Sequence, residues 1–175
     1  MKKLFYIVII GIMTITSSCG EEEANYVIPS TPVNFSIDIN KADNHLNGGG
    51  NVAVYIDPRE ANVSDEYKQS VNAVSLARLF SRAMAGEYLG YSGLLVVNLG
   101  TSFKAYDLCC SYEQQKAVRV IPTNDSFKAK CPKCGSIFDL YADGRAISGN
   151  ATTKGKKLQT YTLRPAGDNK FRITN

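Results

Sequence analysis

Four of the five cysteines in this chain of 175 residues lie in two short segments, and this arrangement constrains the fold more than any other feature. Cys109 and Cys110 stand in the first segment, residues 109–112, and Cys131 and Cys134 stand in the second, residues 131–136. Strand-like sequence lies between the two segments and after the second one. Two cysteine loops that project from a sheet are suited to clamp a metal ion. The pattern therefore predicts a β scaffold that carries both loops at one end.

Short apolar segments predict that the rest of the chain is built mainly of β-strands. Residues 33–39 alternate apolar and polar side chains, which is typical of a half-buried strand, and residues 93–99 are almost continuously apolar, which is typical of a central strand. We expect strands at residues 33–39, 51–56, 93–99, 103–108, 117–121, 127–130, 137–141, 158–163 and 171–174. Tight turns separate them, as at Asp143-Gly144. The sum predicts a small antiparallel sandwich or barrel.

Residues 64–86 show a different periodicity. Apolar side chains recur at roughly helical spacing from Val71 to Met84. Ser64 or Asp65 could cap the N-terminus of a helix, and Gly86 would end it. We therefore predict one amphipathic helix over residues 64–86, inserted between strands and packed against the sheet.

The cysteine segments and the strands around them resemble a Rieske-type 2Fe–2S domain. The matching positions are Cys110-Ser111-Tyr112 in the first loop, residues 131–136 in the second, Gly144, Gly149 and Ala151 in a hairpin, and Leu158, Tyr161 and Leu163 in a last strand. The resemblance implies one Rieske-like β domain over residues 33–175. Its family places histidine ligands where this chain has Tyr112 and Cys134. A Rieske centre needs two histidines, and the only histidine here is His45, so the standard ligand set is absent.

Three interpretations of the four cysteines remain open at the level of sequence. In the first, the chain has kept the fold and lost the cluster, and Cys110 forms a disulfide with Cys131 or Cys134 that stabilises the domain by about 2–4 kcal/mol. In the second, Cys131-x-x-Cys134 and Cys110 hold zinc or a 2Fe–2S cluster, with Tyr112 or water as a further ligand. In the third, Cys131 and Cys134 form a redox-active dithiol, although no helix follows to activate them.

Cys109 fits none of these sites easily. Adjacent residues of an extended strand point to opposite faces, so Cys109 and Cys110 can hardly reach one ion together unless the backbone bends there. We expect Cys109 to be a buried structural thiol or one half of a bridge, and Tyr112 to be a packing aromatic.

The N-terminus has the pattern of an exported lipoprotein. Two lysines precede an apolar run over residues 4–15, which is too short to span a bilayer and suited to a signal peptide. Small residues then lead to Cys19, and this site resembles a bacterial lipobox. The resemblance implies a signal peptide at residues 1–18, acylation of Cys19 by chains such as palmitate, and a tether over residues 19–32. Three glutamates at residues 21–23 resemble a surface-export tag, so we expect a lipid anchor at the outer membrane or cell surface of a Gram-negative bacterium.

Composition narrows the function further. The formal net charge is +4, and two of these charges belong to the predicted signal peptide, which gives no case for nucleic-acid binding. No carboxylate pair or serine–histidine set has catalytic spacing, so no catalytic residue is predicted. We expect a non-enzymatic structural or interaction module at the cell envelope, with no cofactor. The alternative is a zinc or iron–sulfur protein that transfers electrons through Cys110, Cys131 and Cys134, as a carrier for an oxidoreductase.

Overall fold

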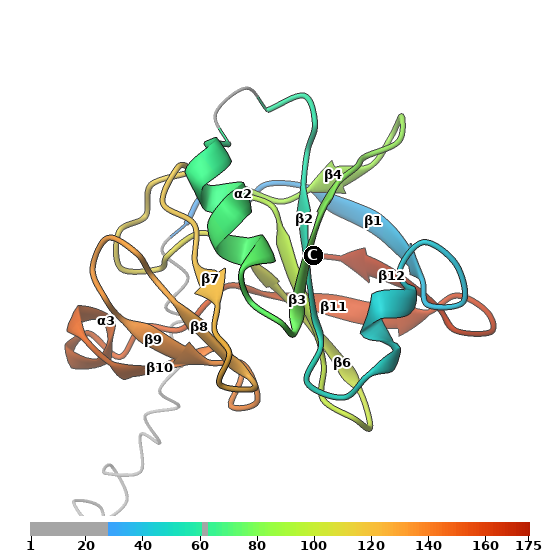
Figure 1. Ribbon diagram of the computed structural model, residues 1–175. Coiled ribbons are helices and arrows are strands. Elements are labelled where there is room, and N and C mark those ends of the chain that lie inside the picture. Colours follow the sequence, from blue (N-terminus) through green and yellow to red (C-terminus); the bar gives the residue numbers. More distant parts are fainter. Residues whose placement is uncertain (1–27, 61–62) are drawn as a thin grey trace, which may run out of the picture.

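The computed structural model describes residues 28–60 and 63–175 (Figure 1). Within these residues the protein is mainly β, as predicted, and consists of a large curled sheet with a smaller sheet beside it. No helix in this part of the chain is long and apolar enough to span a bilayer. The predicted signal peptide and Cys19 lie outside the described residues.

The large sheet has eight strands and curls into a half-barrel. In spatial order these are β3 (Ala77–Ser81), β2 (Val52–Ile56), β5 (Leu94–Asn98), β6 (Phe103–Asp107), β11 (Thr160–Pro165), β12 (Lys170–Thr174), β1 (Val33–Asp38) and β4 (Tyr88–Leu89). Neighbouring strands run antiparallel except β2 and β3, which are parallel. The short 3-10 helix η1 (Asn44–Asn47) lies at one end of the curl.

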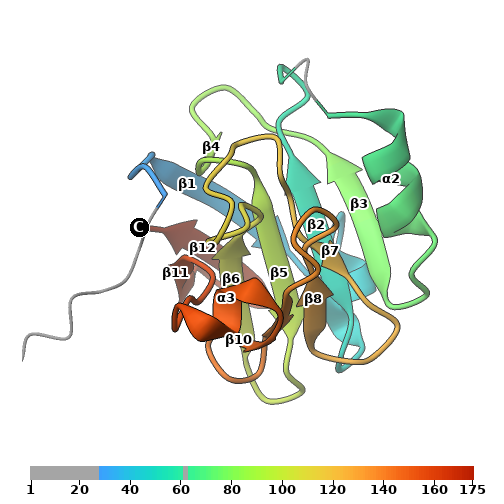
Figure 2. The ribbon, with the colours of Figure 1, turned by 90° about the vertical axis from the view of Figure 1, so that its left-hand side faces the viewer.

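The small sheet has four strands and packs against the outer face of the large one (Figure 2). Its order is β10 (Arg145–Ser148), β9 (Ile137–Asp139), β8 (Lys128–Lys130) and β7 (Ile121–Pro122), and the short helix α3 (Asn150–Thr153) follows β10. Phe138 of β9 and Leu140, just after β9, are fully buried in the cluster that also holds Tyr106 of β6. The Tyr106 hydroxyl donates a hydrogen bond to the Leu140 carbonyl, so the two sheets are joined by a buried polar contact as well as by apolar packing.

Two hydrophobic clusters cover the two faces of the large sheet, and this explains the continuous apolar runs of its central strands. Val54 of β2 and Leu95 of β5 point to the cluster under the small sheet. Tyr55 and Leu94, one position along, point into the curl, where they meet Phe35 of β1. Since both faces are buried, no polar alternation is needed at the centre of the sheet.

The inserted helix is shorter than predicted. Helix α2 covers only Asp65–Asn72, with Ser64 as its N-cap, and the chain then turns and forms β3. The prediction of one helix over residues 64–86 was wrong for its second half because Ala77–Ser81 finds hydrogen-bonding partners along the edge of β2. The apolar spacing of a short segment fits both the helical and the strand period, and here pairing with β2 makes the segment a strand. Ala77 and Leu79 accordingly join the outer cluster and Phe80 the inner one, as a strand requires.

The last residues of the predicted tether lie against the domain. The Gly90 N–H donates to the Pro32 carbonyl at 3.2 Å, and the Asn175 side chain donates to the Thr31 carbonyl at 3.1 Å. Ile28 is buried, at 9% exposure. Residues 28–32 therefore belong to the folded body in this structure.

Candidate metal centre

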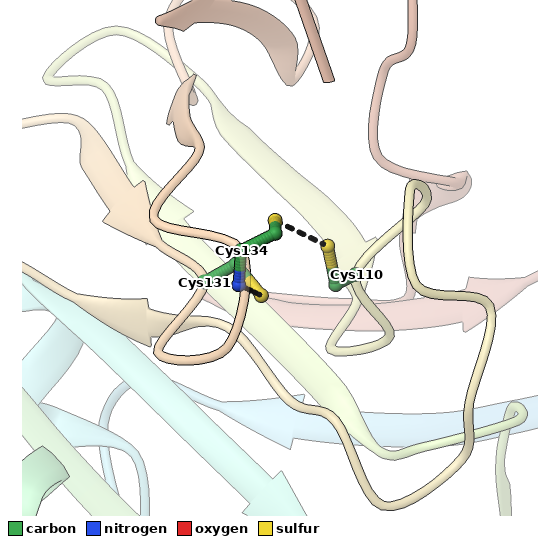
Figure 3. Close-up of side chains that lie close together, drawn as sticks. All are labelled: Cys110, Cys131 and Cys134. Carbon is green, nitrogen blue, oxygen red and sulfur yellow. Dashed lines mark hydrogen bonds between the residues drawn. The ribbon is translucent and has the colours of Figure 1, made fainter. Parts of the chain in front are cut away.

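Three of the four cysteines predicted as site residues come together where the loop after β6 meets the loop between β8 and β9 (Figure 3). Cys110 stands just after β6, at the start of what we term the first cysteine turn, residues 110–114. Cys131 and Cys134 belong to the second cysteine turn, residues 131–135, between β8 and β9. The three sulfur atoms lie within 4.8 Å of one another, and the Cys110 and Cys134 sulfurs are 3.7 Å apart. We call these residues the cysteine cluster.

Backbone hydrogen bonds fix the second cysteine turn. The Gly135 N–H donates to the Cys131 carbonyl at 3.0 Å, and the Cys131 N–H donates to the Ser136 carbonyl at 2.9 Å. The Cys134 N–H points at the Cys131 sulfur, 3.5 Å away. Gly135 has a φ of +72°, which glycine adopts without strain. The sequence favours this turn because proline is a common turn residue and Gly135 supplies the positive φ that closes the turn.

The first cysteine turn has the same construction. The Gln114 N–H donates to the Cys110 carbonyl at 2.9 Å, and the Cys110 N–H donates to the Val118 carbonyl at 3.0 Å. Gln114 has a φ of +56°, so it occupies the place that Gly135 holds in the other turn. The backbone N–H groups of Glu113 and Tyr112 act to lower the pKa of the Cys110 thiol, although the hydrogen bond with Cys131 and burial outweigh them. In each turn, backbone N–H groups of the third and fourth residues thus favour the thiolate form of the first cysteine.

The thiols of the cysteine cluster differ in acidity. The pKa of Cys131 falls to about 6, first because the Cys110 thiol donates toward its sulfur and also because the backbone N–H groups of Cys134 and Lys133 stabilise the thiolate. The pKa of Cys110 is raised because its proton is held in that hydrogen bond and because the group is buried. The pKa values of the two coupled thiols therefore shift in opposite directions, and Cys131 is the more acidic of the pair.

Ser136 supports the cluster from the side of helix α3. Its hydroxyl accepts a hydrogen bond from the Ala151 N–H at 2.9 Å and contacts the Cys134 sulfur at 3.3 Å. Gly149 passes so close that an added Cβ would lie 2.7 Å from the Ser136 Cα. This close approach ties the segment after β10 to the second cysteine turn.

Cys109 does not belong to the cluster. Its sulfur faces the Gln115 carbonyl at 3.5 Å, and burial raises its pKa to about 12. Beneath it lies Asp107, a fully buried carboxylate that accepts a hydrogen bond from the Cys109 N–H at 2.7 Å. The Asp107 carboxylate also accepts from the backbone of Ser92 and from the Tyr161 hydroxyl, so it anchors the start of the first cysteine turn to its surroundings.

The remaining residues considered from sequence lie elsewhere. Tyr112 is partly buried and packs against the outer hydrophobic cluster. The ring of His45, on η1, contacts the Leu76 carbonyl at 3.1 Å and is not a member of the cysteine cluster. A Rieske centre with two histidine ligands therefore does not fit the side chains at this site.

An ion pair that sequence reasoning missed joins the two cysteine turns. The Lys133 ammonium lies 2.7 Å from the Glu113 carboxylate and 3.2 Å from the Gln115 side-chain oxygen. Only 12% of the Glu113 side chain is exposed. The signal in the sequence is the shared spacing of Cys110-x-x-Glu113 and Cys131-x-x-Cys134.

The cluster offers three sulfur donors for one metal ion. The described cysteines are all free thiols, so the predicted bridge from Cys110 is not formed here. A disulfide has sulfurs about 2.05 Å apart, whereas the Cys110 and Cys134 sulfurs are 3.7 Å apart. Thiolate donors favour zinc, Cu(I) and iron over magnesium or calcium.

No protein-family model and no curated protein matches the chain. The Rieske resemblance therefore stays a prediction, carried by the residues of the two cysteine segments.

Proposed function

We propose that this domain binds one thiophilic metal ion, zinc in the first place, through Cys110, Cys131 and Cys134, and serves as a metal-stapled, non-enzymatic interaction module at the cell envelope. The observation that carries the proposal is the convergence of three sulfurs from two separate turns within 4.8 Å. Zinc would join the end of β6 to the β8–β9 connection and so hold the small sheet on the large one. A structural role follows because zinc has no redox chemistry of its own.

The construction of the turns supports a metal over a simple pair of thiols. Backbone N–H groups in each turn favour the thiolate forms of Cys110 and Cys131. A thiolate ligand needs that stabilisation, whereas a neutral disulfide does not. Metal binding would also displace the proton that Cys110 holds, so affinity should rise with pH.

The donor set favours a single ion over a 2Fe–2S cluster. An all-cysteine 2Fe–2S cluster needs four thiolates, and the cysteine cluster supplies three. Cys109 would have to turn away from the Gln115 carbonyl to become the fourth. Zinc and a single iron ion share the same requirement for soft donors, so metal analysis is needed to separate them.

The experiment compares metal binding by the reduced full chain with that of four serine variants. Wild-type protein and Cys109→Ser should each bind one zinc per chain, because Cys109 lies outside the cluster. Cys110→Ser, Cys131→Ser and Cys134→Ser should each weaken zinc binding at least tenfold. Absence of stoichiometric binding by the wild type, or equal losses in all four variants, would overturn the proposal.

A second candidate is the covalently stapled module, favoured by the 3.7 Å between the Cys110 and Cys134 sulfurs. Here the two thiols would give up two protons and two electrons to an external disulfide such as glutathione disulfide, which is reduced to two thiols, and one S–S bond would form. Closing this loop would stabilise the domain by about 2–4 kcal/mol. Peptide mapping of the protein isolated without reductant tests it: a Cys110–Cys134 bridge supports the staple, and free thiols with bound metal support the zinc site.

The envelope location rests on the lipobox-like sequence that ends in Cys19. Acyl chains on this residue would hold the domain at the outer membrane or cell surface. Labelling with a palmitate analogue should mark the wild type and leave Cys19→Ala unlabelled. Recovery of the wild type in the aqueous phase after detergent partition would contradict the anchor.

A further inference from the structure

We infer that Glu113 supplies the fourth ligand of the metal site, through its side-chain carboxylate. This inference rests on the proposed function, since it concerns the coordination of the same ion. It comes from a position-by-position match between the two cysteine turns. In the sequence alone, this match is visible only as the shared spacing of Cys110-x-x-Glu113 and Cys131-x-x-Cys134.

The two turns match in their hydrogen bonds and in their backbone conformation. In each, the fifth residue donates to the carbonyl of the first, Gln114 to Cys110 at 2.9 Å and Gly135 to Cys131 at 3.0 Å. Both fifth residues have positive φ, +56° and +72°. The backbone N–H groups that act to lower the pKa of each first thiol also come from the same two positions, the third and the fourth.

This correspondence places Glu113 where the other turn has a metal ligand. Cys131 supplies the first sulfur of its turn and Cys134, three residues on, supplies the second. In the first turn Cys110 is followed three residues on by Glu113. Two turns that face each other across one ion would then each give two ligands, three sulfurs and one carboxylate oxygen, which completes the four that zinc takes in structural sites.

The setting of Glu113 suits that role. Its side chain is 12% exposed, and its carboxylate is paired with Lys133 of the opposite turn at 2.7 Å. Ligating carboxylates are usually held by an outer partner of this kind. The carboxylate lies outside the 4.8 Å that joins the three sulfurs, so the side chain has to turn toward them on binding. This movement would break the ion pair with Lys133, whose half-exposed ammonium can be hydrated by water instead.

Other oxygen donors at the site are less suitable. Ser136 is engaged by the Ala151 N–H and the Cys134 sulfur. The Ser111 hydroxyl is buried and has no hydrogen-bond partner in the described part of the chain, which makes it the nearest rival within the first turn. A neutral hydroxyl is a weaker ligand for zinc than a carboxylate, which is among its usual donors.

The test uses Co²⁺ as a spectroscopic probe in the reduced full chain, followed by competition with Zn²⁺. Glu113→Gln should keep the sulfur-to-cobalt absorption of three thiolates, lose about tenfold or more in affinity, and show an altered ligand-field spectrum. Asp168→Asn, which removes one negative charge from the exposed β11–β12 turn, should bind as the wild type does. Ser111→Ala should also leave the spectrum unchanged.

The outcomes separate this inference from the proposed function. A wild type that binds no metal would overturn both. A wild type that binds Co²⁺ through three thiolates while Glu113→Gln matches it in affinity and spectrum would overturn the role of Glu113 alone. A loss confined to Ser111→Ala would assign the fourth position to that hydroxyl instead.

Discussion

Asp107→Ala tests whether one buried carboxylate anchors the first cysteine turn. Asp107 is fully buried and accepts hydrogen bonds from the backbone N–H groups of Cys109 at 2.7 Å, Tyr91 at 2.8 Å and Ser92 at 3.2 Å. The Tyr161 hydroxyl adds a fourth at 2.8 Å. Removing the carboxylate leaves these donors without their acceptor, while Cys109 and Ser92 stay buried.

The magnitude follows from those two buried donors. Each unsatisfied buried N–H costs about 1–3 kcal/mol, which gives about 2–6 kcal/mol for the Cys109 and Ser92 donors together. Part of this is offset because burial raises the pKa of Asp107, so the ionised carboxylate is itself disfavoured in the folded state. We expect the free energy of unfolding to fall by about 3 kcal/mol, a large fraction of the stability of a domain of this kind.

The assay is urea unfolding of the full chain, monitored by circular dichroism. The slope of the unfolding free energy against urea concentration is compared between the variants, to ensure that the same transition is observed. Asp125→Ala is the matched control, because its exposed side chain pairs with Lys128 near the surface, and we expect a change below about 0.5 kcal/mol. A loss below about 1 kcal/mol in Asp107→Ala would refute the anchoring role. Reduced metal affinity should accompany the loss of stability, since the first cysteine turn would be held less firmly.

Three further predictions concern the cluster and its support. Gly149→Ala should destabilise the protein by about 2 kcal/mol more than Gly155→Ala. An added Cβ at Gly149 would lie 2.7 Å from the Ser136 Cα, whereas a Cβ at Gly155 would have no neighbour within 4 Å. Equal unfolding midpoints of the two variants would contradict this prediction. Tyr106→Phe should cost about 1–2 kcal/mol in urea unfolding, because a buried carbonyl just after β9 loses its donor, and an unchanged midpoint would show that this bond does not join the sheets. In metal-free protein, the thiolate absorbance should rise with pH around pH 6, because the lowered pKa of Cys131 places the loss of its proton there. The Cys131→Ser variant should lack this rise. A rise that persists in the variant would show that another group titrates there.

The strands were predictable where burial alone decides the pattern. The alternation from residue 33 onward and the apolar run from residue 93 correspond to β1 and β5, because one strand buries one side of its pleat and the other buries both. Strand β3 was not predictable from its own residues. Its apolar spacing also fits a helix, and only the free edge of β2 decides between the two.

The candidate site was predictable in its sulfur atoms and not in its surroundings. The Cys131-x-x-Cys134 spacing and the neighbouring cysteine segment pointed to Cys110 as a partner, and the structure brings these three together. Glu113 and Lys133 were missed because nothing in the sequence distinguishes them from other charged residues. Their role becomes visible only when the fold brings the two cysteine turns face to face. The buried role of Asp107 likewise depends on donors from a separate segment of the chain.

X-ray absorption at the zinc edge of the zinc-loaded full chain tests the central claim most directly. The cysteine cluster predicts three sulfur neighbours per zinc at about 2.3 Å and one oxygen neighbour at about 2.0–2.2 Å. Cys109→Ser should give the same spectrum. Zinc surrounded only by nitrogen and oxygen, or a spectrum unchanged when Cys110, Cys131 and Cys134 are all replaced by serine, would contradict the account.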